Sequence, residues 1–105
     1  MAKQSLFLKA FGDPPLLRVL DFLVVHDDFD YSLTDIAALS GVSYSTIKLL
    51  WKDLEKHGIV VLTRKVGKAK MYHLNEQNPA VKKLKEFYWT TVRSMARKPS
   101  ITKII

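Results

Sequence analysis

The sequence predicts a mainly α protein with one small β-hairpin, an α+β fold, in a single domain that spans residues 1–105. Four stretches repeat apolar residues at helical spacing; an acidic loop separates the first two, and glycine or proline separates the others. A β-branched run at residues 59–63 is followed, after a glycine, by a second short run, as expected of a hairpin. With 105 residues, 48% of them hydrophobic, the chain has room for one small core.

The first long helix is expected over residues 14–26. Asp13 can cap free amides, while Pro14 and Pro15 suit a first turn in which no amide needs to donate. The helix is apolar over most of its surface, so it needs two packing partners. Its apolar residues are Leu16, Leu17, Val19, Leu20, Phe22, Leu23 and Val24. Residues 6–11, which precede it, could form a short helix or an extended arm.

Two further helices with a tight corner between them are expected over residues 32–57. Ser32, with Asp35 three residues later, resembles a capping box, so the first of the two begins at about Leu33. It ends at Gly41, because glycine reaches a positive φ without steric cost. Its expected buried residues are Ile36, Ala37 and Leu39.

The second helix of the corner is capped by Ser43 and ends before Gly58. Its apolar face, which we expect to be buried, consists of Ile47, Leu50, Trp51 and Leu54. Its opposite face carries Tyr44, Ser45, Lys48, Leu49 and Lys52. The first helix braces the second, so the N-terminal turn of the second projects from the body.

The hairpin is expected over residues 59–76, with a two-residue turn at Gly67 and Lys68. This register places Val61 opposite Leu74, Thr63 opposite Tyr72, and Lys65 opposite Lys70. Like charges that face each other are unfavourable, and Arg64 and Lys68 add to them. A bound anion would relieve the repulsion, although exposed cations can also spread into water.

The last helix is expected over residues 78–97, because Asn78 can cap it and Pro79 fits its first position. Its heptad-like seam is too short to establish a coiled coil. The seam could close the core of one chain, but together with the broadly apolar first helix it favours a homodimer. The expected interface residues are Leu6, Phe7, Phe11, Val19, Phe22, Val81, Leu84, Phe87, Tyr88, Val92 and Met95. The tail after Pro99 is either frayed or packed against the partner.

Charge is distributed unevenly along the chain, whose net charge is +7. Residues 1–43 carry three Lys or Arg against six Asp, and residues 44–105 carry 14 against four acids. A polyanion would therefore meet the second part of the chain. The tight corner points the same way, because a helix whose start carries free amides and hydroxyls suits the major groove of DNA. Such corners also occur in proteins that bind no nucleic acid.

The stretch "IAALSGVSYSTIKLLWKDLEKHGIV", followed by the basic hairpin that closes on Tyr-His-Leu, resembles a known family. It is similar to the winged helix-turn-helix regulators of bacteria and archaea, the ArsR, MarR and TrmB-like group, over roughly residues 14–97. The resemblance implies a winged helix whose terminal helices mediate dimerisation. It also implies a short strand at Tyr31. Two positions depart from the family: Trp51 stands in place of a leucine, and Leu49 in place of a polar contact.

The resemblance implies two sets of DNA-contacting residues. The recognition helix contributes Ser43, Tyr44, Ser45, Thr46, Lys48, Leu49 and Lys52. The hairpin, or wing, contributes Arg64, Lys65, Lys68 and Lys70. Leu49 could contact a thymine methyl group, but an isolated exposed apolar residue is the favoured interpretation.

No pattern for catalysis is present. The three histidines do not have metal-ligand spacing, and the chain has no cysteine. Asp27, Asp28 and Asp30 could hold a hard cation, but they lack the glycine and distal glutamate of an EF-hand loop. We therefore expect neither an enzyme nor a metal site nor a cofactor.

The sequence thus predicts a regulator of transcription that binds double-stranded DNA at a near-palindromic operator as a homodimer. No long apolar run or secretory signal is found, so we expect a cytoplasmic, nucleoid-associated protein without membrane contact. Two alternatives stay open, namely a winged helix that docks on a partner protein and a basic chromatin or RNA-binding module. The sequence leaves open whether a small-molecule effector exists.

Overall fold

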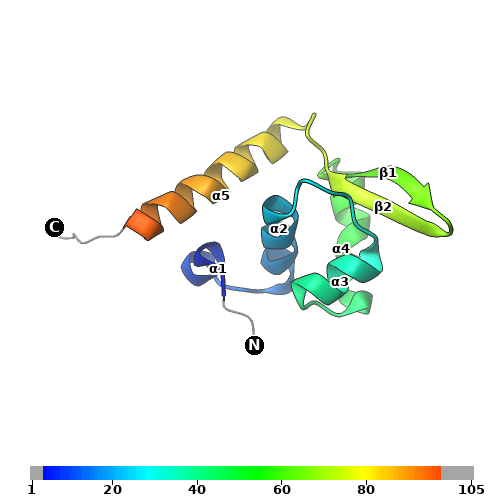
Figure 1. Ribbon diagram of the computed structural model, residues 1–105, viewed down its shortest axis with the longest axis horizontal. Coiled ribbons are helices and arrows are strands. Elements are labelled where there is room, and N and C mark those ends of the chain that lie inside the picture. Colours follow the sequence, from blue (N-terminus) through cyan, green and yellow to red (C-terminus); the bar gives the residue numbers. More distant parts are fainter. Residues whose placement is uncertain (1–3, 98–105) are drawn as a thin grey trace.

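The computed structural model describes residues 4–97. The elements in chain order are α1 (Leu6–Phe11), α2 (Pro15–Val25), α3 (Leu33–Ser40), α4 (Tyr44–Lys56), β1 (Val60–Val66), β2 (Ala69–Leu74) and α5 (Pro79–Arg97) (Figure 1). The predicted α+β class is confirmed, and residues 6–11 form a short helix. Within the described range, none of the helices is both long and apolar enough to cross a bilayer.

Helix α2 is the central helix of the chain. It contacts α1 on one side, α3 on another, and both β2 and α5. Its residues Val19, Phe22 and Val24 are almost completely buried. Most of the wide apolar surface of this helix, from which the sequence favoured a second chain, is thus covered within one chain, while Leu16 and Val25 stay exposed.

The start of α2 differs from the expectation, and the prediction that Asp13 caps it is wrong. The helix begins at Pro15, and the residue at the cap position, Pro14, offers no side-chain acceptor. Asp13 instead accepts a hydrogen bond from Gln4 Nε2 at 3.1 Å and lies 3.8 Å from Arg18 Nη2. The second proline fixes φ at the first helical position, where no amide donor is required.

The corner between α3 and α4 forms as predicted. Ser32 Oγ accepts from the Asp35 amide at 3.2 Å, and Gly41 ends α3 with a φ of +73°. Ser43 Oγ then accepts from the Thr46 amide at 3.3 Å and caps α4. The prediction that Leu39 is buried is wrong: 62% of this residue is exposed, because it lies on the solvent side of α3.

The hairpin has the predicted turn but not the predicted register throughout. Lys65 pairs with Lys70 as expected, and Gly67 adopts a φ of +62° in the turn. A bulge between Leu62 and Arg64 shifts the remaining pairs, so Val61 lies opposite His73 and Leu62 opposite Tyr72. The predicted pairs of Val61 with Leu74 and of Thr63 with Tyr72 are therefore wrong.

Tyr31 adds a third, one-residue strand at the base of the hairpin, as the resemblance implied. Its amide donates to the Tyr72 carbonyl at 2.9 Å, and the Tyr72 amide donates back at 2.8 Å. The segment between α2 and α3 is thereby attached to β2.

A polar corner joins the end of α4 to the start of α5. The Gly58 carbonyl accepts hydrogen bonds from Asn75 Nδ2 at 3.0 Å and from Asn78 Nδ2 at 2.9 Å. Asn78 Oδ1 also accepts from the Ala80 amide at 2.9 Å, which caps the first turn of α5. One carbonyl thus connects two helices that lie far apart in the sequence.

Helix α5 runs along one side of the molecule and lies over α1 (Figure 1). Phe7 of α1 packs against Tyr88 and Phe87 of α5, with ring centroids 4.7 and 5.8 Å apart. Tyr88 Oη donates to Asp21 Oδ1 at 2.6 Å, so α5 is also bonded to α2. The first half of α5 therefore closes the core of its own chain.

Candidate nucleic-acid interface

One face of α4 is buried and the other is open to solvent. Ile47 and Trp51 are 0% and 3% exposed, whereas Tyr44 and Leu49 on the other side are 49% and 71% exposed. Ser43, Ser45, Lys48 and Lys52 are also exposed, and Thr46 is half-buried. The structure thus leaves nearly all the predicted recognition residues accessible to a large ligand.

Hydroxyl groups gather at the N-terminus of α4. Ser43 Oγ donates to Thr46 Oγ1 at 2.9 Å and lies 3.3 Å from Ser45 Oγ. One turn later, Lys48 Nζ lies 5.7 Å from the centre of the Tyr44 ring. The exposed start of the helix therefore presents hydroxyl groups and a cation, which suit phosphate oxygens and base edges.

Three of the four predicted wing cations have no ion-pair partner in the part of the chain that the structure describes. Lys65 and Lys70 face each other across the strands, and Lys68 follows Gly67 in the turn. Among residues 4–97, none of these lysines forms an ion pair. Their mutual repulsion is thus not offset by a direct ion pair with an acid of the described residues.

Arg64, unlike these lysines, forms an ion pair with an acidic residue. Its Nε lies 3.0 Å from Asp30 Oδ2 and its Nη2 3.1 Å from Asp30 Oδ1. The hydrogen bonds from Arg64 and Thr63 lower the pKa of Asp30 from 3.8 to about 2. Nothing in the sequence marks Asp30 as a partner of the wing.

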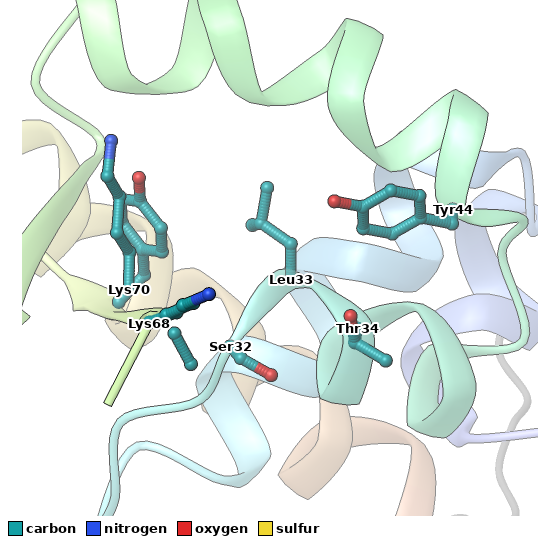
Figure 2. A pocket seen from close by; sticks show the side chains of 8 residues that line it. Ser32, Leu33, Thr34, Tyr44, Lys68 and Lys70 are labelled. Atoms are coloured by element: carbon teal, nitrogen blue, oxygen red, sulfur yellow. The ribbon is translucent and has the colours of Figure 1, made fainter. Parts of the chain in front are cut away.

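A hollow of about 340 Å³ lies between the corner and the wing. It is lined by Ser32, Leu33, Thr34, Tyr44, Lys68, Ala69, Lys70 and Tyr72. Figure 2 shows the Tyr44 hydroxyl and the Lys68 ammonium group pointing toward it from opposite sides. The start of α4 and two of the wing lysines, Lys68 and Lys70, therefore share one concave, cationic surface. The sequence did not indicate the contribution of Leu33 and Thr34, because it depends on how the wing folds back over α3.

The predicted dimer residues divide into two groups. Phe7, Val19, Phe22, Val81 and Tyr88 are buried within the single chain, so they have almost no surface left for a partner. Leu6, Leu84, Val92 and Met95 are partly exposed. Phe11 and Phe87 are 49% and 47% exposed, and their ring centroids lie 5.2 Å apart. These two rings form an aromatic patch across α1 and α5.

A charged cluster that the sequence did not predict lies where the wing meets α5. Lys85 Nζ lies 2.5 Å from Asp27 Oδ2 and 2.9 Å from Glu76 Oε2. His73 Nε2 lies 2.5 Å from the Asp27 carbonyl, and its Nδ1 lies 2.7 Å from the Leu74 carbonyl. Burial alone would lower the pKa of His73, but the two carbonyls and the nearby acids raise it above 6.5.

A helix-turn-helix followed by a basic hairpin that folds back beside it defines a winged helix. Solved structures of regulators have the same arrangement. MepR, a transcription regulator of the Staphylococcus aureus multidrug efflux pump MepA, is similar with a TM-score of 0.62 and 20% identity, over 86% of this chain and 65% of that one. A MarR-family regulator from Silicibacter pomeroyi gives 0.59 and 20%, over 82% of this chain and 56% of that one.

A MepR–DNA complex from S. aureus matches with a TM-score of 0.60 and 19% identity, over 87% of this chain and 73% of that chain. At such low identity, the likeness shows the winged-helix fold, which confirms the fold implied by the resemblance. The chain spans less than two thirds of the length of the first two of these structures. No protein-family model matches the sequence, and no curated protein matches it.

Proposed function

We propose that the protein is a transcription regulator that binds double-stranded DNA through α4 and the wing. The observation that carries this proposal is the shared concave surface, in which the exposed start of α4 and the wing lysines Lys68 and Lys70 border one hollow. A DNA backbone strand that passes between α4 and the wing would meet hydroxyl groups and lysines there, which suit its phosphates. The MepR–DNA complex supports it, because a structure of the same fold contains DNA.

In this proposal, α4 enters the major groove with its exposed side chains toward the base edges. Tyr44, Ser45 and Lys48 at its first turns carry the donors and acceptors that sequence preference requires. Lys65, Lys68 and Lys70 reach the adjacent phosphates, which releases counterions and relieves the repulsion between the facing lysines. The α4 contacts then set specificity, and the wing contributes affinity that depends little on sequence.

The proposed regulator acts as a homodimer. Phe11 and Phe87 expose neighbouring rings on α1 and α5, and apolar side chains gathered in this way favour burial against another surface. This surface lies on helices other than α3 and α4, so two chains could pair and keep both recognition helices accessible (Figure 1). Two-fold symmetry then calls for a near-palindromic operator with half-sites about one helical turn, or roughly 34 Å, apart.

The salt dependence of duplex binding tests the proposal. The parent chain should bind DNA more weakly as salt rises, because phosphate contacts release counterions. Each of Lys68→Ala and Lys70→Ala should lower the slope of log K against log salt by about 0.9 and weaken binding equally to all sequences. Ser45→Ala and Lys48→Ala should instead change which sequence is preferred. Fluorescence anisotropy with a labelled random duplex and a selected operator measures both effects.

Lys83→Ala is the matched control, since Lys83 is an exposed lysine on α5, far from the hollow in sequence. It removes the same charge and should leave the slope unchanged. A parent chain that binds no duplex even at low salt would contradict the proposal and favour a module that docks on proteins. Equal slopes for the wing variants and the parent would remove the wing from the interface.

A further inference from the structure

Arg64 stands apart from the other wing cations because its guanidinium group already has a partner. Two of its nitrogens bond to the two carboxylate oxygens of Asp30, at 3.0 and 3.1 Å. The Asp30 side chain is only 14% exposed, so this carboxylate lies against the body of the protein. A phosphate that approached Arg64 would meet a cation whose charge is already balanced.

The position of the pair in the hairpin is equally informative. Arg64 directly follows the bulge, and the hydroxyl of the bulged residue, Thr63, also lies within hydrogen-bond distance of Asp30 Oδ2 and of the Met71 carbonyl. The bulge thus directs two consecutive side chains of β1 toward one carboxylate. An undisturbed ladder would place neighbouring side chains on opposite faces.

Asp30 also precedes Tyr31, whose backbone pairs with Tyr72 of β2. The segment between α2 and α3 therefore holds both strands, β2 by backbone hydrogen bonds and β1 by the carboxylate. A hairpin attached through one strand can pivot about that strand, whereas attachment through both strands fixes its angle.

We propose that the Asp30–Arg64 pair fixes the angle of the wing against α3, so that Arg64 acts as a positioning residue and not as a DNA contact. From Arg64 to Gly67 the strand rises about 10 Å, at about 3.3 Å per residue. A pivot of about 20° at the pair would therefore move the turn by roughly 3 Å. Lys68 and Lys70, which border the hollow, would then lie opposite the phosphates in only a fraction of the free molecules, which weakens binding without removing a contact from the complex. This inference rests on the proposed function, because it assigns Arg64 a role within the same interface.

The slope of duplex binding against salt separates a positioning role from a contact. Arg64→Ala should weaken binding by roughly tenfold, because fewer free molecules hold the wing at the binding angle. The slope should stay close to that of the parent chain, because the complex keeps its lysine–phosphate contacts and Arg64 made none. Lys68→Ala shows how far the slope falls when one phosphate contact is lost. Lys65→Ala removes the same charge as Arg64→Ala from the neighbouring position of the strand and serves as a second reference. A slope that falls for Arg64→Ala by as much as for Lys68→Ala would overturn the proposal.

Asp30→Asn should change DNA affinity in opposite directions under the two interpretations of Arg64, as a positioning residue or as a DNA contact. If the pair positions the wing, this variant should weaken binding about as much as Arg64→Ala, and combining both substitutions should add little. If Asp30 merely occupied a DNA-binding arginine, its neutralisation would strengthen binding and steepen the slope by about 0.9. Exchanging the two residues, in Asp30→Arg with Arg64→Asp, should recover part of the loss, which two independent defects would not show.

A distance measurement without DNA distinguishes failure of this inference from failure of the proposed function. The chain has no cysteine, so Ala38→Cys on α3 and Val66→Cys beside the turn accept two spin labels without competing sites. The distance distribution should be narrow in the parent chain and broad or shifted after Asp30→Asn. An unchanged distribution would overturn the inference even if DNA binding were established. A broadened one would support it even if no duplex bound.

Discussion

Both ring nitrogens of His73 face carbonyl oxygens, namely those of Asp27 and Leu74. A carbonyl only accepts hydrogen bonds, and a neutral imidazole has a single N–H to donate. The neutral ring would therefore hold a lone pair against an oxygen, so this geometry favours the protonated ring. Glu76 and Asp27 add negative charge beside it, while Lys85, which is bonded to both acids, reduces their effect.

Stability should consequently depend on the proton of His73. The folded pKa lies above the ordinary value of 6.5, so this contribution to the free energy of unfolding is complete below that pH and is lost as pH rises through the folded pKa. Urea unfolding followed by tryptophan fluorescence should show stability falling across this window. His73→Gln should remove most of the decline, while His57→Gln, at an exposed histidine, should retain it. The same decline in all three chains would contradict the role of His73.

At the scale of elements, one face of α4 packs in the core and the opposite face is open to a ligand. Ile47 is completely buried and Leu49, two residues later, is 71% exposed, although both are aliphatic. The position on the helix, and not the residue type, therefore decides what each side chain contributes. This division allows the exposed face to be changed without loss of the fold.

Two substitutions that remove the same number of carbon atoms test this division. Ile47→Ala should lower the free energy of unfolding by about 2–5 kcal/mol, because it leaves a cavity in the core. Leu49→Ala should change it by less than about 0.5 kcal/mol, as expected for an exposed site. Urea unfolding of the two variants measures the difference. A similar loss of unfolding free energy in both variants would mean that Leu49 is packed against another part of the folded protein.

The elements also show which parts of the fold were predictable from the sequence. The four longer helices, the caps at Ser32 and Ser43 and the turn at Gly67 depend on residues a few positions apart, and these were predicted correctly apart from the cap of α2. The bulged residue Thr63 is hydrogen-bonded to Asp30, which lies 33 residues earlier. The His73 contact with the Asp27 carbonyl spans 46 residues. Such pairings follow from the assembled fold, so neither the wing register nor the partner of Arg64 could be predicted locally.

The candidate site divides along the same line. The exposed face of α4 follows from helical spacing alone, and the structure leaves it open as the sequence predicted. The hollow requires the wing to fold back over α3, which no local pattern specifies. The buried members of the expected dimer surface, such as Val19, show the same limit: spacing identifies an apolar face but not what covers it.

At the scale of the whole molecule, the exposed rings of Phe11 and Phe87 make pairing of two chains testable. A charge placed between two such patches would be buried in the dimer without a partner, which is costly. Phe87→Glu should therefore yield a monomer in size-exclusion chromatography with light scattering, and should weaken binding to a palindromic operator more than to a half-site. Phe29→Glu is the control, because Phe29 is 67% exposed but lies outside α1 and α5. A parent chain that is monomeric at micromolar concentration would remove the dimer from the proposal.

The Gly58 carbonyl, held by the amides of Asn75 and Asn78, has a consequence for such a pair. These two hydrogen bonds join the C-terminal end of α4 to the N-terminal end of α5. In each protomer of a dimer, α4 and α5 would therefore move together. The angle at which the two α5 helices cross would then determine the distance between the two α4 helices. A ligand that changed this crossing angle would change the distance between the two α4 helices, so that it no longer matched one helical turn of DNA. The ligand would not need to contact either α4 helix.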